Sequence, residues 1–145
     1  MYKDIYVVNN TFFNNGSEGW AGEIANFSRS TINQNLVVKN NIFYNQESEA
    51  DWTIWLQQNH EQMVMSHNLY YIFKPSNNGE NSFYEEDLHV TDIKDVNPNF
   101  TNLPTDLTLQ SSSIAINKGE TITLPGSSEL LFSTDINNYS RGSSN

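Results

Sequence analysis

The chain has 145 residues, which is enough for one domain with a modest core. It carries 17 Asp and Glu against 7 Lys and Arg, and a formal net charge of −10 disfavours binding to nucleic-acid phosphates and to anionic membrane surfaces. The absence of cysteine excludes disulfides and thiolate metal sites. No apolar stretch is long enough for a membrane span, and the first residues lack the apolar core of a signal peptide, which leaves the compartment open.

Asparagine is the most unusual part of the composition, with 22 residues in the chain. Asn tolerates left-handed backbone conformations and hydrogen-bonds its own backbone in tight turns. A protein made of short strands joined by repeated tight turns uses it heavily. The 3 Trp, 7 Tyr and 8 Phe indicate a packed core and argue against disorder.

Three segments of the chain repeat one pattern, in which an apolar strand is followed by a polar pair ending in Asn and by a short aromatic strand. They are Ile5–Asn15, Leu36–Gln46 and Met63–Tyr71. Asn10, Asn41 and Asn68 take the same place in the pattern, 31 and then 27 residues apart. The apolar runs have no helical period, and this spacing fits the turns of a parallel β-helix.

In such a fold the equivalent side chains of successive coils stack in columns. Lys39 has to point outward, so the two-residue alternation of a strand places Leu36 and Val38 inside. The same alignment adds Ile5, Val7, Met63 and Met65 to the interior. The column of Asn10, Asn41 and Asn68 is predicted to pass amide hydrogen bonds from coil to coil inside the bend.

Beyond the bend the alignment predicts two aromatic columns. Their members are Phe12, Phe43 and Tyr70 in one column and Phe13, Tyr44 and Tyr71 in the other. A third strand per coil is expected in the intervals between the repeats, at residues 23–27 and 53–56.

After Tyr71 the repeat stops, and residues 72–95 are predicted to form a long acidic loop. Residues 1–95 would thus hold the coils and this loop, and residues 96–145 the C-terminal strands and cap of the same domain. From Asp95 onward the chain contains four motifs, namely Asp95–Phe100, Asp106–Gln110, Ser113–Gly119 and Thr134–Gly142.

With its Asn-Asn-Ile-Phe and Asn-Leu-Tyr-Tyr coils and these motifs in this order, the sequence resembles the C-terminal part of bacterial right-handed parallel β-helix proteins of the pectate-lyase-like class. The resemblance runs from about residue 5 to residue 142. It implies an all-β fold, a short right-handed parallel β-helix of about three to four coils with an irregular C-terminal cap. Ile114, Asn117 and Asn138 depart from the Pro, Asp and Gly of that pattern. The long N-terminal run of coils that usually carries the catalytic groove is missing here. The family includes lyases, hydrolases, epimerases and members of unknown role, so the resemblance indicates the fold and not a particular activity.

The ionisable residues form no complete catalytic site in the sequence. Polysaccharide lyases of this class use Lys and Arg together, but the basic residues of this chain are scattered. Hydrolases need two carboxylates; Glu47, Glu49 and Asp51 cluster on one loop with Glu61 on the next, a pattern that is more typical of solvated loops. We therefore predict no catalytic residues, and the chain leans away from being an enzyme.

No cofactor and no metal site are predicted either. The histidines lack a zinc-binding spacing, and His67 replaces Asn40 of the previous coil, which favours a hydrogen-bonding role in the bend. Asp87, Asp92 and Asp95 match no calcium-binding loop.

Exposed tryptophan is the best indication of function. With Ile54 and Leu56 inside, Trp55 points outward, and Trp20 and Trp52 are expected in nearby loops. Tryptophan stacks well on the apolar faces of sugar rings, so a neutral oligosaccharide is the expected ligand, with Trp20, Trp52, Trp55 and Glu61 as binding residues. The alternative is that the 72–95 loop covers Trp55.

Two functions stay open at this point. The first is a non-catalytic β-helix module that binds carbohydrate or a protein partner. The second is the C-terminal part of a carbohydrate-active enzyme, a polysaccharide lyase or glycoside hydrolase, whose active site lies mostly outside this chain.

The first coil also suggests an assembly. A terminal coil exposes unpaired strand edges, and the four residues before Ile5 are too few to cover them. Residues 96–142 are expected to fold across the other end. We therefore expect a homodimer through the N-terminal coil about a two-fold axis, with a monomer closed by its own 72–95 loop as the alternative.

Overall fold

The computed structural model describes residues 4–15, 19–26, 35–45, 50–56, 63–71, 87–123, 126–131 and 133–134, with the backbone alone for β3 and β6. The described residues are all-β and contain no α-helix, so none of them forms a helix that could cross a membrane. The strands are β1 (Asp4–Val8), β2 (Thr11–Phe13), β3 (Gly19–Asn26), β4 (Asn35–Lys39), β5 (Ile42–Tyr44), β6 (Ala50–Leu56), β7 (Met63–Ser66), β8 (Leu69–Tyr71), β9 (Ile93–Lys94), β10 (Phe100–Asn102) and β11 (Asp106–Leu109).

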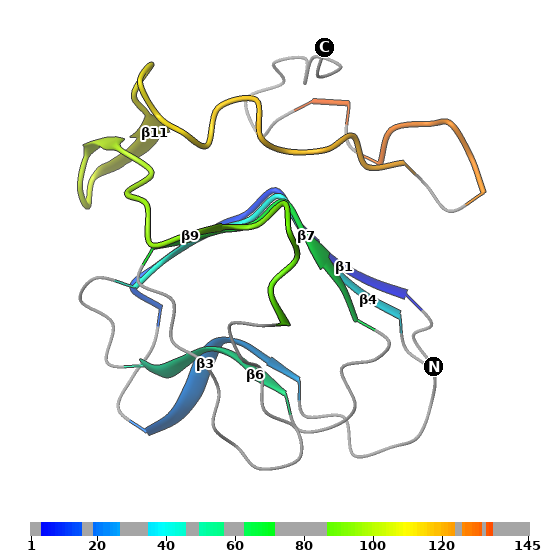
Figure 1. The fold of residues 1–145 in the computed structure, drawn as a ribbon, viewed down its shortest axis with the longest axis horizontal. Helices are drawn as coiled ribbons and strands as arrows, with labels where there is room; N and C mark the ends of the chain where they lie inside the picture. The colour runs from blue at the N-terminus through cyan, green and yellow to red at the C-terminus, as the bar shows by residue number, and fades with distance from the viewer. Residues whose placement is uncertain are drawn as a thin grey trace.

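Three parallel sheets organise the chain. Their strand orders are β1-β4-β7, β2-β5-β8-β9 and β3-β6, and the chain visits the three sheets in turn before returning to the first. We call each such circuit a coil. Figure 1 shows β1, β4 and β7 stacked on one side of the interior, β9 on the adjoining side, and β3 and β6 opposite. The arrangement is compatible with a β-helix.

The register agrees with the alignment of the repeats. Ile5 pairs with Leu36 and Leu36 with Met63, so equivalent residues lie above one another. Leu36 and Val38 are buried in the interior, where Val7 and Met65 pack against their cluster, which confirms the predicted alternation. Ile5 departs from it with 38% exposure, because β1 is the edge strand of its sheet and no described strand covers it from above.

The bend between the first two sheets depends on a left-handed residue in every coil. Asn9, Asn40 and His67 have φ of 58°, 58° and 56°. Asn adopts this conformation more readily than other side chains, which explains the Asn pairs of the repeat. Beside this column Asn41 and Asn68 are buried, and the Asn41 amide donates to the side-chain oxygen of Asn68 at 3.0 Å. The asparagines therefore form a ladder inside the bend.

The aromatic columns are present as predicted. The Phe43 ring lies between Phe12 and Tyr70, with ring centroids 4.9 and 5.0 Å away and nearly parallel planes. Tyr44 lies between Phe13 and Tyr71 at 4.9 Å from each, with the ring planes inclined by 20° and 37°. Stacking at this separation follows from the spacing of parallel strands, so the backbone register itself aligns the rings.

The expectation of a long loop at residues 72–95 is wrong for the described part of that segment, which forms a fourth layer of the stack. Its described part continues the repeat, because β9 pairs in parallel with β8 and Ile93 aligns with Leu69. The backbone N–H of Ile93 donates to Asn68 at 2.8 Å. Thr91 and Asp92 take the places of the residue pair at the bend, where Asp92 accepts hydrogen bonds from Asn68. The signal was missed because Asp replaces Asn and the following strand is only two residues long.

The C-terminal segment also lies elsewhere than expected. The sequence suggested that residues 96–142 fold across the end of the coils, whereas their described part runs along the side of the coils (Figure 1). Phe100 packs on Tyr44 with ring centroids 5.8 Å apart. Further on, Glu120 contacts the second and third coils at Asn40 and Ser66. The outward faces of the first two sheets are thus partly covered by this segment, which we call the tail (residues 96–123).

Candidate functional site

The tail is fastened to the bend by a paired hydrogen bond across 80 residues of sequence. The Asn40 amide donates to the Glu120 carbonyl at 2.8 Å, and the Glu120 N–H donates to the Asn40 side-chain oxygen at 2.9 Å. Gly119 permits this approach, because a Cβ there would lie 3.1–3.2 Å from the Asn40 side chain. The left-handed bend residue therefore serves both the coil and the docking of the tail.

The Glu120 carboxylate contacts three side chains, which lie at or just after the ends of the neighbouring strands β4 and β7. Its carboxylate forms an ion pair with Lys39, accepts a hydrogen bond from the Ser66 hydroxyl at 3.2 Å, and lies 3.7 Å from Nδ1 of His67. Partial burial opposes ionisation, but the hydrogen bond and charge of Lys39, followed by His67 and Ser66, outweigh it and lower the pKa of Glu120. The Glu120 carboxylate therefore serves to hold the tail against the coils.

Glu120→Gln should lower the free energy of unfolding at pH 7 by less than about 1 kcal/mol, because the ion pair is partly exposed. A carboxyl with a lowered pKa stabilises the fold above its ordinary pKa, and this contribution disappears as the pH falls through the lower folded value. Urea unfolding of wild type and variant should therefore differ at pH 7 and converge near about pH 3. Glu129→Gln, an exposed site beyond the tail, is the matched charge control and should change nothing. A difference that grows on acidification would contradict this role.

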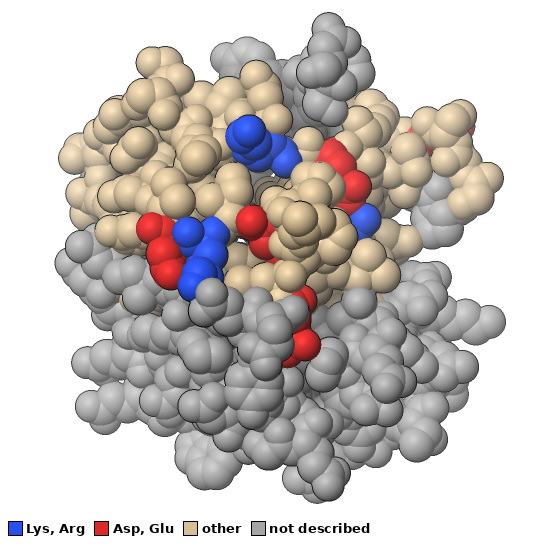
Figure 2. All heavy atoms as spheres, in the orientation of Figure 1, with Lys and Arg blue, Asp and Glu red and all other residues tan. Residues whose placement is uncertain are grey.

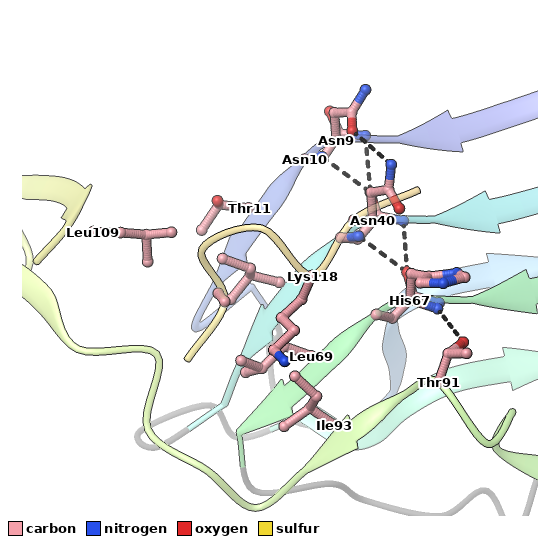
Figure 3. Close-up of a pocket in the computed structure, with 15 residues that line it drawn as sticks. Asn9, Asn10, Thr11, Asn40, His67, Leu69, Thr91, Ile93, Leu109 and Lys118 are labelled. Carbon is pink, nitrogen blue, oxygen red and sulfur yellow. Dashed lines mark hydrogen bonds between the residues drawn. The ribbon is translucent and has the colours of Figure 1, made fainter. Parts of the chain in front are cut away.

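A cavity of about 250 Å³ lies between the bend and the tail (Figure 3). We call it the bend pocket. One wall is apolar and comes from the outward column of the second sheet, namely Ile42, Leu69 and Ile93. The adjoining wall is polar and comes from the bend column, namely Asn9, Asn40, His67 and Thr91. The tail closes the pocket with Leu109, Ala115, Lys118 and Gly119. Its two walls therefore differ sharply in polarity.

The charge of the bend pocket is opposite to that of the whole chain. None of the described residues that line it is Asp or Glu, and Lys118 extends from the tail toward Leu69 (Figure 3). Within the described residues Lys118 has no ion-pair partner, whereas Lys39 pairs with Glu120 and Lys94 with Asp95 at 3.4 Å. Acidic and basic atoms of the described residues are scattered over the face seen in Figure 2 rather than gathered into a patch. The Asn40 amide already donates to Asn9 and Glu120. The described part of the pocket thus sets the Lys118 ammonium beside an apolar wall, without a general acid–base pair.

Asp92 lies at the end of the asparagine ladder rather than in a cation site. One carboxylate oxygen accepts the Asn68 N–H at 2.8 Å, and the other accepts the His89 N–H at 3.0 Å. Burial raises the pKa of Asp92, and the hydrogen bonds from Asn68 and His89 oppose this rise only in part. The part of the chain that the structure describes contains no group of three or more His, Asp or Glu side chains that could hold a metal ion.

The tryptophans predicted to bind sugar lie on strands. Trp20 belongs to β3, whereas Trp52 and Trp55 belong to β6, so the expectation of loops for Trp20 and Trp52 was wrong. Trp52 pairs with Gly22, and Trp55 pairs with Ala25. The predicted third strand of each coil is thereby confirmed, although both strands are longer than expected. The direction of the three indole rings, and Glu61 altogether, lie outside the described residues.

A comparison with family models, with curated proteins and with solved structures finds no match. The site therefore has to be interpreted from its own geometry.

Sequence reasoning missed the bend pocket because its walls come from distant segments. Lys118 lies in the recognised Ser113–Gly119 motif, but only the docking of Glu120 on Asn40 brings that motif over the second sheet. A usable signal was the outward column of Ile42, Leu69 and Ile93, since an apolar column facing outward requires a cover.

Proposed function

We propose that this chain is a non-catalytic recognition module on a right-handed parallel β-helix, and that the bend pocket binds one neutral sugar unit. The right-handed sense rests on the strong preference of parallel crossover connections for that hand. The observation that carries the function is the composition of the pocket: amides, hydroxyls and one lysine lie beside an apolar wall, and none of the described residues that line it is a carboxylate.

Sugar recognition suits this composition. A sugar ring has a rim of hydroxyls and apolar C–H faces, so it complements a pocket that sets polar groups beside an apolar wall. The volume of about 250 Å³ is slightly below the range of pockets for drug-sized ligands, which favours a single ring over a longer chain. Glycoside hydrolysis requires two carboxylates, and the described residues that line the pocket supply none. The nearest carboxylate on the tail, Glu120, is neutralised by Lys39.

The test is binding of glucose, galactose, mannose and rhamnose, followed by chemical-shift changes in two-dimensional NMR spectra. We expect at least one sugar to bind with a Kd of about 1 mM, as suits a single ring. Ala115→Phe should fill the pocket and weaken this binding at least tenfold, since Ala115 lines it from the tail. Ser112→Phe is the matched control, because Ser112 is exposed on the same segment and does not line the pocket.

The outcomes separate the competing functions. Binding that survives Ala115→Phe but is lost in Trp55→Ala would move the site to β3 and β6, as the sequence first suggested. Release of reducing ends or of unsaturated products from polysaccharides would favour the enzymatic alternative. Failure of all four sugars to bind would overturn the proposal.

A further inference from the structure

The asparagine ladder has a direction. We call the first coil the upper end of the stack, so that each later coil lies below the one before it. The backbone N–H and the side-chain amide of Asn41 both donate to the side-chain oxygen of Asn68, in the coil below, at 3.0 and 3.0 Å. Its amide also donates upward, to the Val7 carbonyl at 2.8 Å, and Asn68 repeats this contact with Val38 at 2.9 Å. The ladder ends below at Asp92, whose carboxylate only accepts.

At the upper end, Asn10 forms the hydrogen bonds to the coil below, but the described residues offer it no hydrogen bonds from a coil above. Its N–H and amide donate to Asn41 at 3.0 and 3.2 Å. Its side-chain oxygen accepts no hydrogen bond from the described residues, whereas the corresponding oxygens of Asn41 and Asn68 accept two each. Its amide turns to the Val8 carbonyl of its own coil at 3.0 Å, in place of a carbonyl above. Asn10 is thus an incomplete member of the ladder.

The rest of the first coil is incomplete in the same direction. β1, β2 and β3 are each the edge strand of their sheet, and no described strand lies above any of them. The side chains there are more exposed than their counterparts one coil below: Ile5 is 38% exposed against 7% for Leu36. The upper side of this coil therefore has the groups that pair with another parallel coil.

Neither mode of self-association supplies the missing donors. Two copies meeting first coil to first coil would reverse the strand direction across the contact, so no residue would offer the N–H, amide and upstream carbonyl as the inner coils do. A head-to-tail copy would place Asp92 above Asn10, but Asp92 has no side-chain amide and its N–H already donates to the His89 carbonyl at 2.8 Å. The net charge of −10 opposes both modes as well.

We propose that the upper side of the first coil is a docking surface for another polypeptide, which adds an extended segment as a further parallel coil. The segment carries a side-chain amide at the bend and a free carbonyl three residues before it, the spacing of Val38 and Asn41. Its N–H and amide donate to the Asn10 oxygen, and its carbonyl accepts the Asn10 amide. A charge that is neutral or positive suits it.

The probe is a synthetic peptide with the sequence of residues 35–46, which contains these groups at the required spacing. Labelled peptide should bind the purified protein in fluorescence anisotropy. The matched control peptide replaces the residue corresponding to Asn41 with Leu, which keeps size and charge but removes the donors, and should bind at least about tenfold more weakly. In the protein, Asn10→Leu should have the same effect, with circular dichroism as the check on folding.

Amide exchange locates the complex. The Thr11 N–H takes the place of the Ile42 and Leu69 N–H groups, each of which donates to the coil above. Its exchange should therefore slow when the peptide binds, while that of Thr108 in β11 stays unchanged. Equal binding of the Leu peptide, or unchanged Thr11 exchange, would overturn the proposal. A dimer in light scattering whose Thr11 is already protected without peptide would overturn it too, in favour of self-association.

Discussion

Replacing Phe43 with alanine should lower the free energy of unfolding by about 3–5 kcal/mol. Phe43 is fully buried, and its ring stacks between Phe12 and Tyr70 at 4.9 and 5.0 Å. Truncation removes the transfer free energy of the ring and leaves a cavity between two stiff strands that cannot collapse into it. Both ring contacts are lost at once, which adds to the effect.

Urea unfolding followed by circular dichroism measures this loss, and Phe12→Ala is the control. Phe12 belongs to the same column, but it is only partly buried and stacks on one described ring. Its truncation should lower the free energy of unfolding by about half as much. Equal losses at the two positions would mean that the first coil is as enclosed as the second, contrary to its edge position.

Asn41→Ala should have the second largest effect, about 2–3 kcal/mol. Asn41 is buried, and truncation leaves the Val7 carbonyl and the Asn10 N–H without their partners inside the bend. A buried polar group that loses its partner retains the full cost of its desolvation, which exceeds the net value of one hydrogen bond. The change removes donor and acceptor together, so the coils on both sides are affected.

The control is Asn10→Ala at the top of the ladder. Asn10 is exposed, so water replaces the lost hydrogen bonds and the free energy of unfolding should fall by less than about 1 kcal/mol. Urea unfolding of both variants, at equal salt and pH, gives the comparison. If Asn10→Ala is as destabilising as Asn41→Ala, the ladder contributes no cooperative stability inside the bend.

The sequence determined the coils, because their signals are local and repeat along the chain. Two-residue alternation places Val38 inside, and the Asn pair sets a left-handed bend at Asn40. Once three such segments share one register, the stacking of Phe43 and Tyr44 on their neighbours follows from strand spacing. The fourth layer was missed because Thr91 and Asp92 perform the function of the Asn pair with different side chains.

Only the tertiary structure decided where the tail lies and what it encloses. The contact between Asn40 and Glu120 joins residues 80 apart, and it depends on shape and on paired hydrogen bonds that leave no periodic pattern in the sequence. The same contact places Lys118 over the outward column of Leu69 and Ile93 and so creates the bend pocket. Local backbone preference and alternation act within a few residues, whereas a pocket between two distant segments requires their packing to be known first.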